Sequence, residues 1–340
     1  MNELSTLRNA AYEKALLSPS ICLTDQNTVQ DLIISRLPTH DQPLCKAAAH
    51  HFSKPGKMIR AKMAMHGADA LQINQTAAIR WAAAVEVLHN ASLVHDDICD
   101  GDKQRRGNQA VWAKFGRNVA LTLGDWLIAL SFEFAAEAAE ISNTPRLMRI
   151  LAQHMSRTTA GEAMELEWDG NFDWDAYLTI AADKTAPLLT APLQGIAVMA
   201  GDQHAEQTIS AYFRDLGVAY QIGNDIANFN GNDGAKLVAG DLARRAPNAV
   251  TLSFVDKLNA DERIIFEQWY RSGDIKDLAA WRDRVLNSFA IQAASDRMFG
   301  TLDQAEKKAA HLSVELSDVT TPVQKLINQA CTAACTNPAA

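Results

Sequence analysis

Cysteine is scarce in this chain of 340 residues, and its five cysteines form no CxxC pair. This spacing gives no sign of a disulfide framework. Residues 1–18 also lack the apolar core of a secretory signal. Both absences favour a reducing compartment, and we therefore expect a cytoplasmic protein.

Basic stretches are absent as well. The formal net charge is −8, the isoelectric point is about 5.6, and no basic stripe is interleaved with aromatic residues. Nucleic acid is therefore not expected as a partner, and anionic substrates must be held by local cations. The longest uncharged stretch, residues 185–201, is too short and too interrupted by proline to cross a bilayer, so no transmembrane segment is expected.

Linkers rich in proline, glycine or serine are missing, and hydrophobic residues make up 48% of the chain. We predict a single domain over residues 1–340 with a large core. Strand-like alternation is almost absent, whereas apolar residues recur with helical spacing over residues 43–53, 57–72, 76–97, 117–140, 144–166, 174–200, 203–228, 249–257, 260–271, 277–291 and 294–314. This pattern predicts an all-α fold, a large orthogonal or layered helical bundle around a central cavity.

The segment Leu93–Gly107 contains the most informative motif, because clustered carboxylates there precede paired arginines at the end of a helical pattern. On a helix, Asp96 and Asp100 lie one turn apart on the same face. Such hard oxygen ligands favour Mg²⁺, which keeps several waters and shares its remaining positions with substrate phosphates. Arg105 and Arg106 can each bind phosphate oxygens through two hydrogen bonds. The segment therefore suits a magnesium-bridged diphosphate.

A second segment, Tyr220–Asp233, resembles the first in its acidic and amide side chains and in its position at the end of a predicted helix. This internal similarity suggests two helices that face each other across a pocket.

Several further motifs occur in a fixed order, and together they resemble those of the trans-isoprenyl diphosphate synthases, the polyprenyl synthetase family, over roughly residues 45–255. The motifs are GKxxR at 56–60, His89, DDxxD at 96–100, RRG at 105–107, GD at 124–125, KT at 184–185 and the lead-in to a second acidic motif at 213–222. The resemblance implies the isoprenoid synthase fold and a homodimer.

The resemblance also implies roles for individual residues. Asp96 and Asp100 would bind Mg²⁺ that bridges to an allylic diphosphate, with Asp97 supporting them. The allylic diphosphate would be held by Arg105, Lys184 and Lys236. The diphosphate of isopentenyl diphosphate would be held by Lys57, Arg60, His89 and Arg106. Lys184 and Asp225 would be further catalytic residues, and Thr185 and Gln221 would bind substrate.

This arrangement suits a prenyl transfer that begins with ionisation. Metal and lysine charges stabilise the departing diphosphate, and the double bond of isopentenyl diphosphate attacks the allylic cation. Water must be excluded because it would quench the cation. The leaving diphosphate then takes the proton, so no dedicated base is needed.

The second acidic motif departs from the family pattern DDxxD. Asn224, Asp225 and Asn228 stand at its metal-binding positions, and two of these three are amides without negative charge. We expect two or three Mg²⁺ ions, the third bound weakly. The family's GKxT has become residues 245–248, and Lys236 lies about two residues closer than usual. Asn224, Asn228 and Asn232 match the spacing of a terpene synthase metal triad incompletely.

Three interpretations remain open. The favoured one is a chain-elongating synthase, because all four residues for isopentenyl diphosphate are present, and the small Ala91 five residues before Asp96 then predicts a product of C20 or longer. The second is a specialised terpene synthase, or a prenyltransferase that makes irregular products or uses another acceptor, on the same scaffold. The third is a non-catalytic partner subunit.

Glu162 and Glu165 stand where the family often has GQxxD, and there a ligand role and an exposed acidic face are equally plausible.

Overall fold

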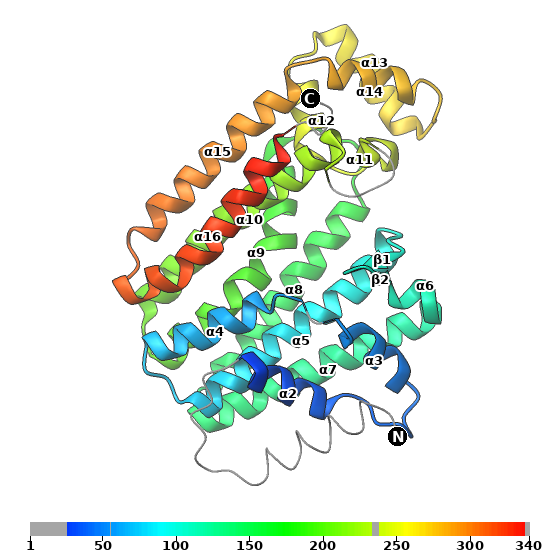
Figure 1. Ribbon diagram of the computed structural model, residues 1–340. Helices are drawn as coiled ribbons and strands as arrows, with labels where there is room; N and C mark the ends of the chain where they lie inside the picture. Colours follow the sequence, from blue (N-terminus) through cyan, green and yellow to red (C-terminus); the bar gives the residue numbers. More distant parts are fainter. Residues whose placement is uncertain (1–25, 55, 233–237, 337–340) are drawn as a thin grey trace. The chain divides into compact units, whose positions relative to one another are not determined.

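The computed structural model describes residues 26–54, 56–232 and 238–336 (Figure 1). Lys236, one of the predicted diphosphate ligands, lies outside the described residues. Fifteen helices, labelled α2 to α16, and one short two-stranded hairpin run through the described part of the chain. The prediction of an all-α fold is therefore confirmed.

The described residues form two compact units. Unit 1 comprises the described residues up to Gln153 together with Ala191–Glu206, and unit 2 comprises His154–Thr190 and the described residues from Gln207 onward. The boundaries fall inside three long helices, α8 (Arg146–Leu166), α9 (Trp174–Met199) and α10 (Gln203–Asn230). The single domain expected over residues 1–340 stays a prediction.

The elements that lie wholly in unit 1 are α2 (Gln26–Arg36), α3 (Cys45–Phe52), α4 (Ile59–Ala70), α5 (Gln75–Cys99), β1 (Gln104–Arg105), β2 (Asn108–Gln109), α6 (Val111–Phe115) and α7 (Arg117–Ser142). Those that lie wholly in unit 2 are α11 (Gly240–Arg244), α12 (Ala249–Val255), α13 (Ala260–Ser272), α14 (Leu278–Leu286), α15 (Ala290–Ala309) and α16 (Val314–Ala334).

Helix α5 is a core helix of unit 1 and presents the first acidic motif. Asn74 caps its first turn by accepting a hydrogen bond from the amide of Ala77 (3.1 Å). Alanines on several faces of the helix are fully buried, which allows neighbouring helices to approach closely. The helix ends at Cys99, and Gly101 follows with a φ of +72° that glycine adopts without strain. The carboxylates therefore lie at the end of a firmly packed helix.

Helix α7 packs along α5. At Gly124 the two helices come so close that the ring of His95 occupies the space a side chain would need. Among the described residues, α7 is also the one helix long and apolar enough to cross a membrane by length and composition, with 44% of its most apolar window buried. Asp125 and Glu133 interrupt the apolar residues of α7, so the helix does not form a long uncharged stretch in the sequence. Its packing on α5 is typical of a core helix.

An aromatic cluster belongs to the core of unit 2. Phe266 and Trp281 meet edge to face with ring centroids 4.9 Å apart. The guanidinium of Arg245 lies 3.7 Å from the ring centroid of Trp269 and donates a hydrogen bond to the backbone oxygen of Asp274 (2.7 Å). These contacts fix the loop between α11 and α12.

Candidate active site

The three carboxylates at the end of α5 point into different surroundings. Asp96 and Asp100 are half-buried and lie one helical turn apart, as the motif predicts. Asp97 is only 1% exposed and accepts hydrogen bonds from Nε (2.7 Å) and Nη2 of Arg105. Burial raises the pKa of Asp97, and the adjacent Arg105 opposes this shift. Asp97 therefore positions Arg105, while Asp96 and Asp100 keep the one-turn spacing that the sequence predicts.

The two arginines lie on the hairpin β1–β2, which the sequence analysis did not predict. Arg105 pairs with Asn108 across the ladder. Arg106 and Gly107 form the two-residue turn, with φ values of +53° and +74°. Positive φ at both central residues is typical of the type I′ turn that suits a hairpin. Gly107 adopts this conformation freely, whereas Arg106 is held in a conformation unusual for a side chain of its size.

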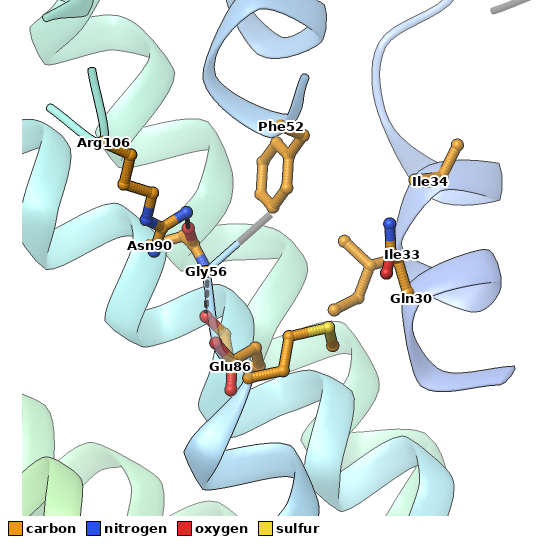
Figure 2. A pocket seen from close by; sticks show the side chains of 9 residues that line it. Gln30, Ile33, Ile34, Phe52, Gly56, Glu86, Asn90 and Arg106 are labelled. Atoms are coloured by element: carbon orange, nitrogen blue, oxygen red, sulfur yellow. Dashed lines mark hydrogen bonds between the residues drawn. The ribbon is translucent and has the colours of Figure 1, made fainter. Parts of the chain in front are cut away.

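The guanidinium of Arg106 is held by several groups of unit 1 (Figure 2). Its Nη1 lies 3.4 Å from both the side-chain oxygen of Asn90 and the backbone oxygen of Lys54. Gly56 lies against it so closely that an added Cβ would stand 2.8 Å from Nη2. Burial lowers the pKa of Arg106, and the nearby Glu86 opposes this shift. The glycine of the GKxxR motif thus makes room for the second arginine of the RRG motif.

A small hollow that opens to solvent lies beside this arginine. Figure 2 shows Arg106 and Asn90 together near Gly56, with Glu86 beyond them. The remaining lining residues are mostly apolar and come from α2, α3 and the start of α4: Gln30, Ile33, Ile34, Phe52 and Met58.

Glu86 is a residue that the sequence analysis missed. Its carboxylate is buried in α5 and accepts a hydrogen bond from the amide of Ala61 (3.1 Å), in the first turn of α4. Burial raises the pKa of Glu86, and the charge of Arg60 opposes this shift. The sequence does contain a signal for Glu86, because it is a charged residue inside the otherwise apolar run 82–88. Glu86 therefore anchors the turn that presents Arg60.

The other residues predicted for isopentenyl diphosphate also lie in unit 1. Lys57 is exposed and precedes Met58, whose φ of +49° turns the chain into α4. His89 is half-buried, and burial lowers its pKa, with Arg60 and Arg106 adding to the effect. Arg60 and Arg106 thus both act electrostatically on His89.

In unit 2, the predicted catalytic Lys184 lies between two carboxylates of α8. Its ammonium is 2.8 Å from Glu162 and 3.0 Å from Glu165. These two acidic residues therefore do not form a solvated helix face.

A hydrogen-bonded chain connects three further predicted site residues of unit 2, Thr185, Gln221 and Asp225. Thr185 donates to the side-chain oxygen of Gln221 (3.2 Å), and Gln221 donates to Asp225 (3.1 Å). Asp225 is 2% exposed and also accepts from the hydroxyl of Tyr177 and the amide of Ala249, both at 2.7 Å. Burial raises the pKa of Asp225 well above its usual value, and Asp241 adds to the shift. Both of its oxygens accept hydrogen bonds, so a metal ion would have to share them.

The three asparagines of the second motif have different environments. Asn224 is exposed, whereas Asn228 is buried and its side-chain oxygen accepts from the amide of Asp241 (3.2 Å). Asn232 donates instead to the backbone oxygens of Ala333 (3.4 Å) and Thr336 (2.5 Å) beside the end of α16. The third position of a terpene synthase triad is therefore engaged elsewhere.

Residues 245–248 stand at the position of the family's GKxT motif. Arg245, at the glycine position, has a left-handed backbone with φ +62°, and Ala246 stands at the lysine position. Asn248 is fully buried and caps α12 by accepting from the amide of Val250 (2.9 Å). This segment contributes packing and capping but no cation equivalent to the family's lysine. Within the described ranges no cluster of three or more His, Cys, Asp or Glu side chains is arranged to hold a metal ion.

Comparisons with known proteins agree with the motifs. The family model "Polyprenyl synthetase" matches residues 41–284. A geranylgeranyl diphosphate synthase of Saccharolobus solfataricus is 30% identical over 248 residues, covering 70% of this chain and 74% of that protein. An octaprenyl diphosphate synthase of Haemophilus influenzae is 27% identical over 293 residues, covering 83% of this chain and 88% of that protein.

Solved structures give the same fold. A decaprenyl diphosphate synthase from Rhodobacter capsulatus superposes with a TM-score of 0.79 at 23% identity, covering 97% of this chain and 99% of that one. The extent of the family match decides the assignment, and the chain belongs to the polyprenyl synthetase family of trans-prenyltransferases.

Proposed function

We propose that this protein condenses isopentenyl diphosphate with an allylic prenyl diphosphate and so elongates a prenyl chain. The observation that supports this most directly is the arrangement of Arg106. Its guanidinium is fixed by Gly56, Asn90 and a strained turn, and its charge contributes to the lowered pKa of His89. Strain of this kind persists where the surrounding structure enforces it, as at a pre-organised binding site.

Asp96 and Asp100 fit Mg²⁺, since two carboxylates one helical turn apart leave room for waters and phosphate oxygens. Bound there, the ion would supply positive charge to the diphosphate leaving group. Arg105, oriented by Asp97, would hold the same diphosphate, and Lys57, Arg60, His89 and Arg106 would hold that of isopentenyl diphosphate. In unit 2, we propose that Lys184, Thr185 and Gln221 bind the allylic substrate. A second metal group at Asn224, Asp225 and Asn228 would be weak, because only one member is charged.

We also propose a cytoplasmic homodimer. The most apolar window of α7 is less than half buried within one chain, and Leu121 is exposed on that helix. A second copy would cover such a surface. Mass measurement by light scattering in solution tests this, and a monomer at micromolar concentration would contradict it.

Incubation with Mg²⁺, isopentenyl diphosphate and each of the C5, C10, C15 and C20 allylic diphosphates tests the proposed activity. We expect linear diphosphates of C20 or longer, because Ala91 is small. Mass analysis before and after dephosphorylation identifies them. Products made without isopentenyl diphosphate, or hydrocarbons that carry no diphosphate, would instead support the specialised synthase that the amides of the second motif suggest.

A further inference from the structure

The ammonium of Lys184 forms ion pairs with two acidic residues of unit 2. The ammonium lies 2.8 Å from a carboxylate oxygen of Glu162 and 3.0 Å from one of Glu165. All three side chains are mostly shielded from water, with exposed fractions of 19%, 16% and 17%. Shielding from solvent makes ion pairs stronger than those at an open surface.

The helix packing places the three groups. Gly161 precedes Glu162 on α8, and a Cβ on Gly161 would stand only 2.5 Å from the backbone nitrogen of Lys184. Helices α8 and α9 therefore touch backbone to backbone at this point. The following residues of α8, Glu162 and Glu165, lie within one turn of the contact and reach the ammonium directly.

The local charge is negative rather than positive. Two carboxylates face one ammonium, and Glu165 also acts electrostatically on Asp225 and Tyr177. A diphosphate that approaches Lys184 must therefore compete with groups of its own sign that are already paired with the lysine. The closer of the two, Glu162, is the one whose charge has no counterpart in the family's GQxxD pattern.

We infer that Glu162 is an internal counter-ion that competes with a diphosphate for Lys184, and so lowers the affinity of unit 2 for the allylic substrate. Glu165 keeps Lys184 in place when Glu162 is displaced. Glu162 is thus a residue that sets substrate affinity rather than a catalytic residue. The inference rests on the proposed function to the extent that Lys184 binds a diphosphate.

Glu162→Gln tests this inference, because it removes the charge and keeps an oxygen that can accept from Lys184. The dissociation constant of inorganic diphosphate, measured by calorimetry with and without Mg²⁺, should fall roughly 3- to 10-fold, as expected for one partly shielded charge contact. The Michaelis constant for the allylic substrate should fall in parallel. Glu167→Gln removes the same charge at an exposed position just beyond α8 and should change neither value.

A lysine variant separates direct competition from a merely structural effect. In a Lys184→Ala background, Glu162→Gln should leave diphosphate affinity unchanged, because no ammonium is left for Glu162 and the diphosphate to compete for. Unchanged or weaker binding in Glu162→Gln alone, including no detectable binding, would overturn the inference. If binding tightens but no allylic substrate is elongated, the counter-ion role stands and the proposed function fails.

Discussion

The carboxylate of Asp97 is buried and accepts two hydrogen bonds from the guanidinium of Arg105, across the turn that joins α5 to the hairpin. This contact links the first acidic motif to the RRG motif, and it gives Asp97 a different role from the neighbouring aspartates. Asp97 orients the cation beside it, whereas Asp96 and Asp100 are the metal ligands that we propose.

Loss of this pair should affect both stability and turnover. Asp97→Asn removes the charge that compensates Arg105, so we expect the free energy of unfolding to fall by about 1–3 kcal/mol. The kcat/KM for the allylic substrate should fall at least about 10-fold, because Arg105 is no longer held. Asp102→Asn is the control, since Asp102 lies 3.5 Å from Arg105 but is 57% exposed. Equal effects of the two variants, by denaturation and kinetics, would contradict the assignment.

The turn that presents Arg106 gives a second prediction. Gly107→Ala places a Cβ at φ +74°, so it should destabilise the protein by roughly 1–2 kcal/mol. It should also raise the Michaelis constant for isopentenyl diphosphate more than that for the allylic substrate. Gly300→Ala is the matched control, because Gly300 lies in α15 and an added Cβ meets no atom within 4 Å. That change should be neutral or slightly stabilising, and a similar loss in both variants would argue against a special role for the turn.

Stability should also depend on pH through His51. Burial lowers its pKa from 6.5 to about 4, against a hydrogen bond to Asn90 (3.0 Å). Between these values the unfolded chain binds more protons than the folded one, so stability falls as the pH falls. The loss should reach about 3 kcal/mol by pH 4 and be absent above pH 6.5.

Denaturant titrations across this range measure the effect. His51→Gln should flatten the curve, whereas the exposed His204→Gln should leave its slope intact. Identical slopes in wild type and His51→Gln would show that other groups dominate.

The two amides of the second motif should respond differently to added charge. Asn224 is exposed, so Asn224→Asp should lower the Mg²⁺ concentration needed for half-maximal rate without loss of stability. Asn228 is buried, and Asn228→Asp should lower the melting temperature, because it buries a charge near Asp241. Thermal melts and Mg²⁺ titrations check both, and a lower Mg²⁺ requirement in Asn228→Asp alone would reverse the assignment.

Helices with a strong apolar period could be predicted from the sequence. The segment predicted over residues 76–97 is α5 at Gln75–Cys99, because its small apolar residues are buried over its whole length. Helix α16 was not predicted, and Pro322 lies inside it. The range 277–291 was predicted as one helix, but the chain turns between α14 and α15. The hairpin was missed because strands of two residues show no alternation.

The candidate site could be predicted only in its local parts. The one-turn spacing of Asp96 and Asp100 follows from helix geometry, and the structure retains it. The pairing of Lys184 with Glu162 depends on how α8 packs on α9, which no local pattern contains. Helix geometry places Asp225 about 100° from Asn224 and about 60° from Asn228 around the axis, which is consistent with a buried Asp225 beside an exposed Asn224.

The rate of condensation by Asp96→Ala at saturating Mg²⁺ tests the central claim most directly. If the end of α5 binds the metal that stabilises the leaving diphosphate, turnover should fall by on the order of 10³ or more. Asp69→Ala, an exposed aspartate on α4 of the same unit, should retain wild-type turnover. Near-normal turnover of Asp96→Ala would contradict the proposed ionisation mechanism.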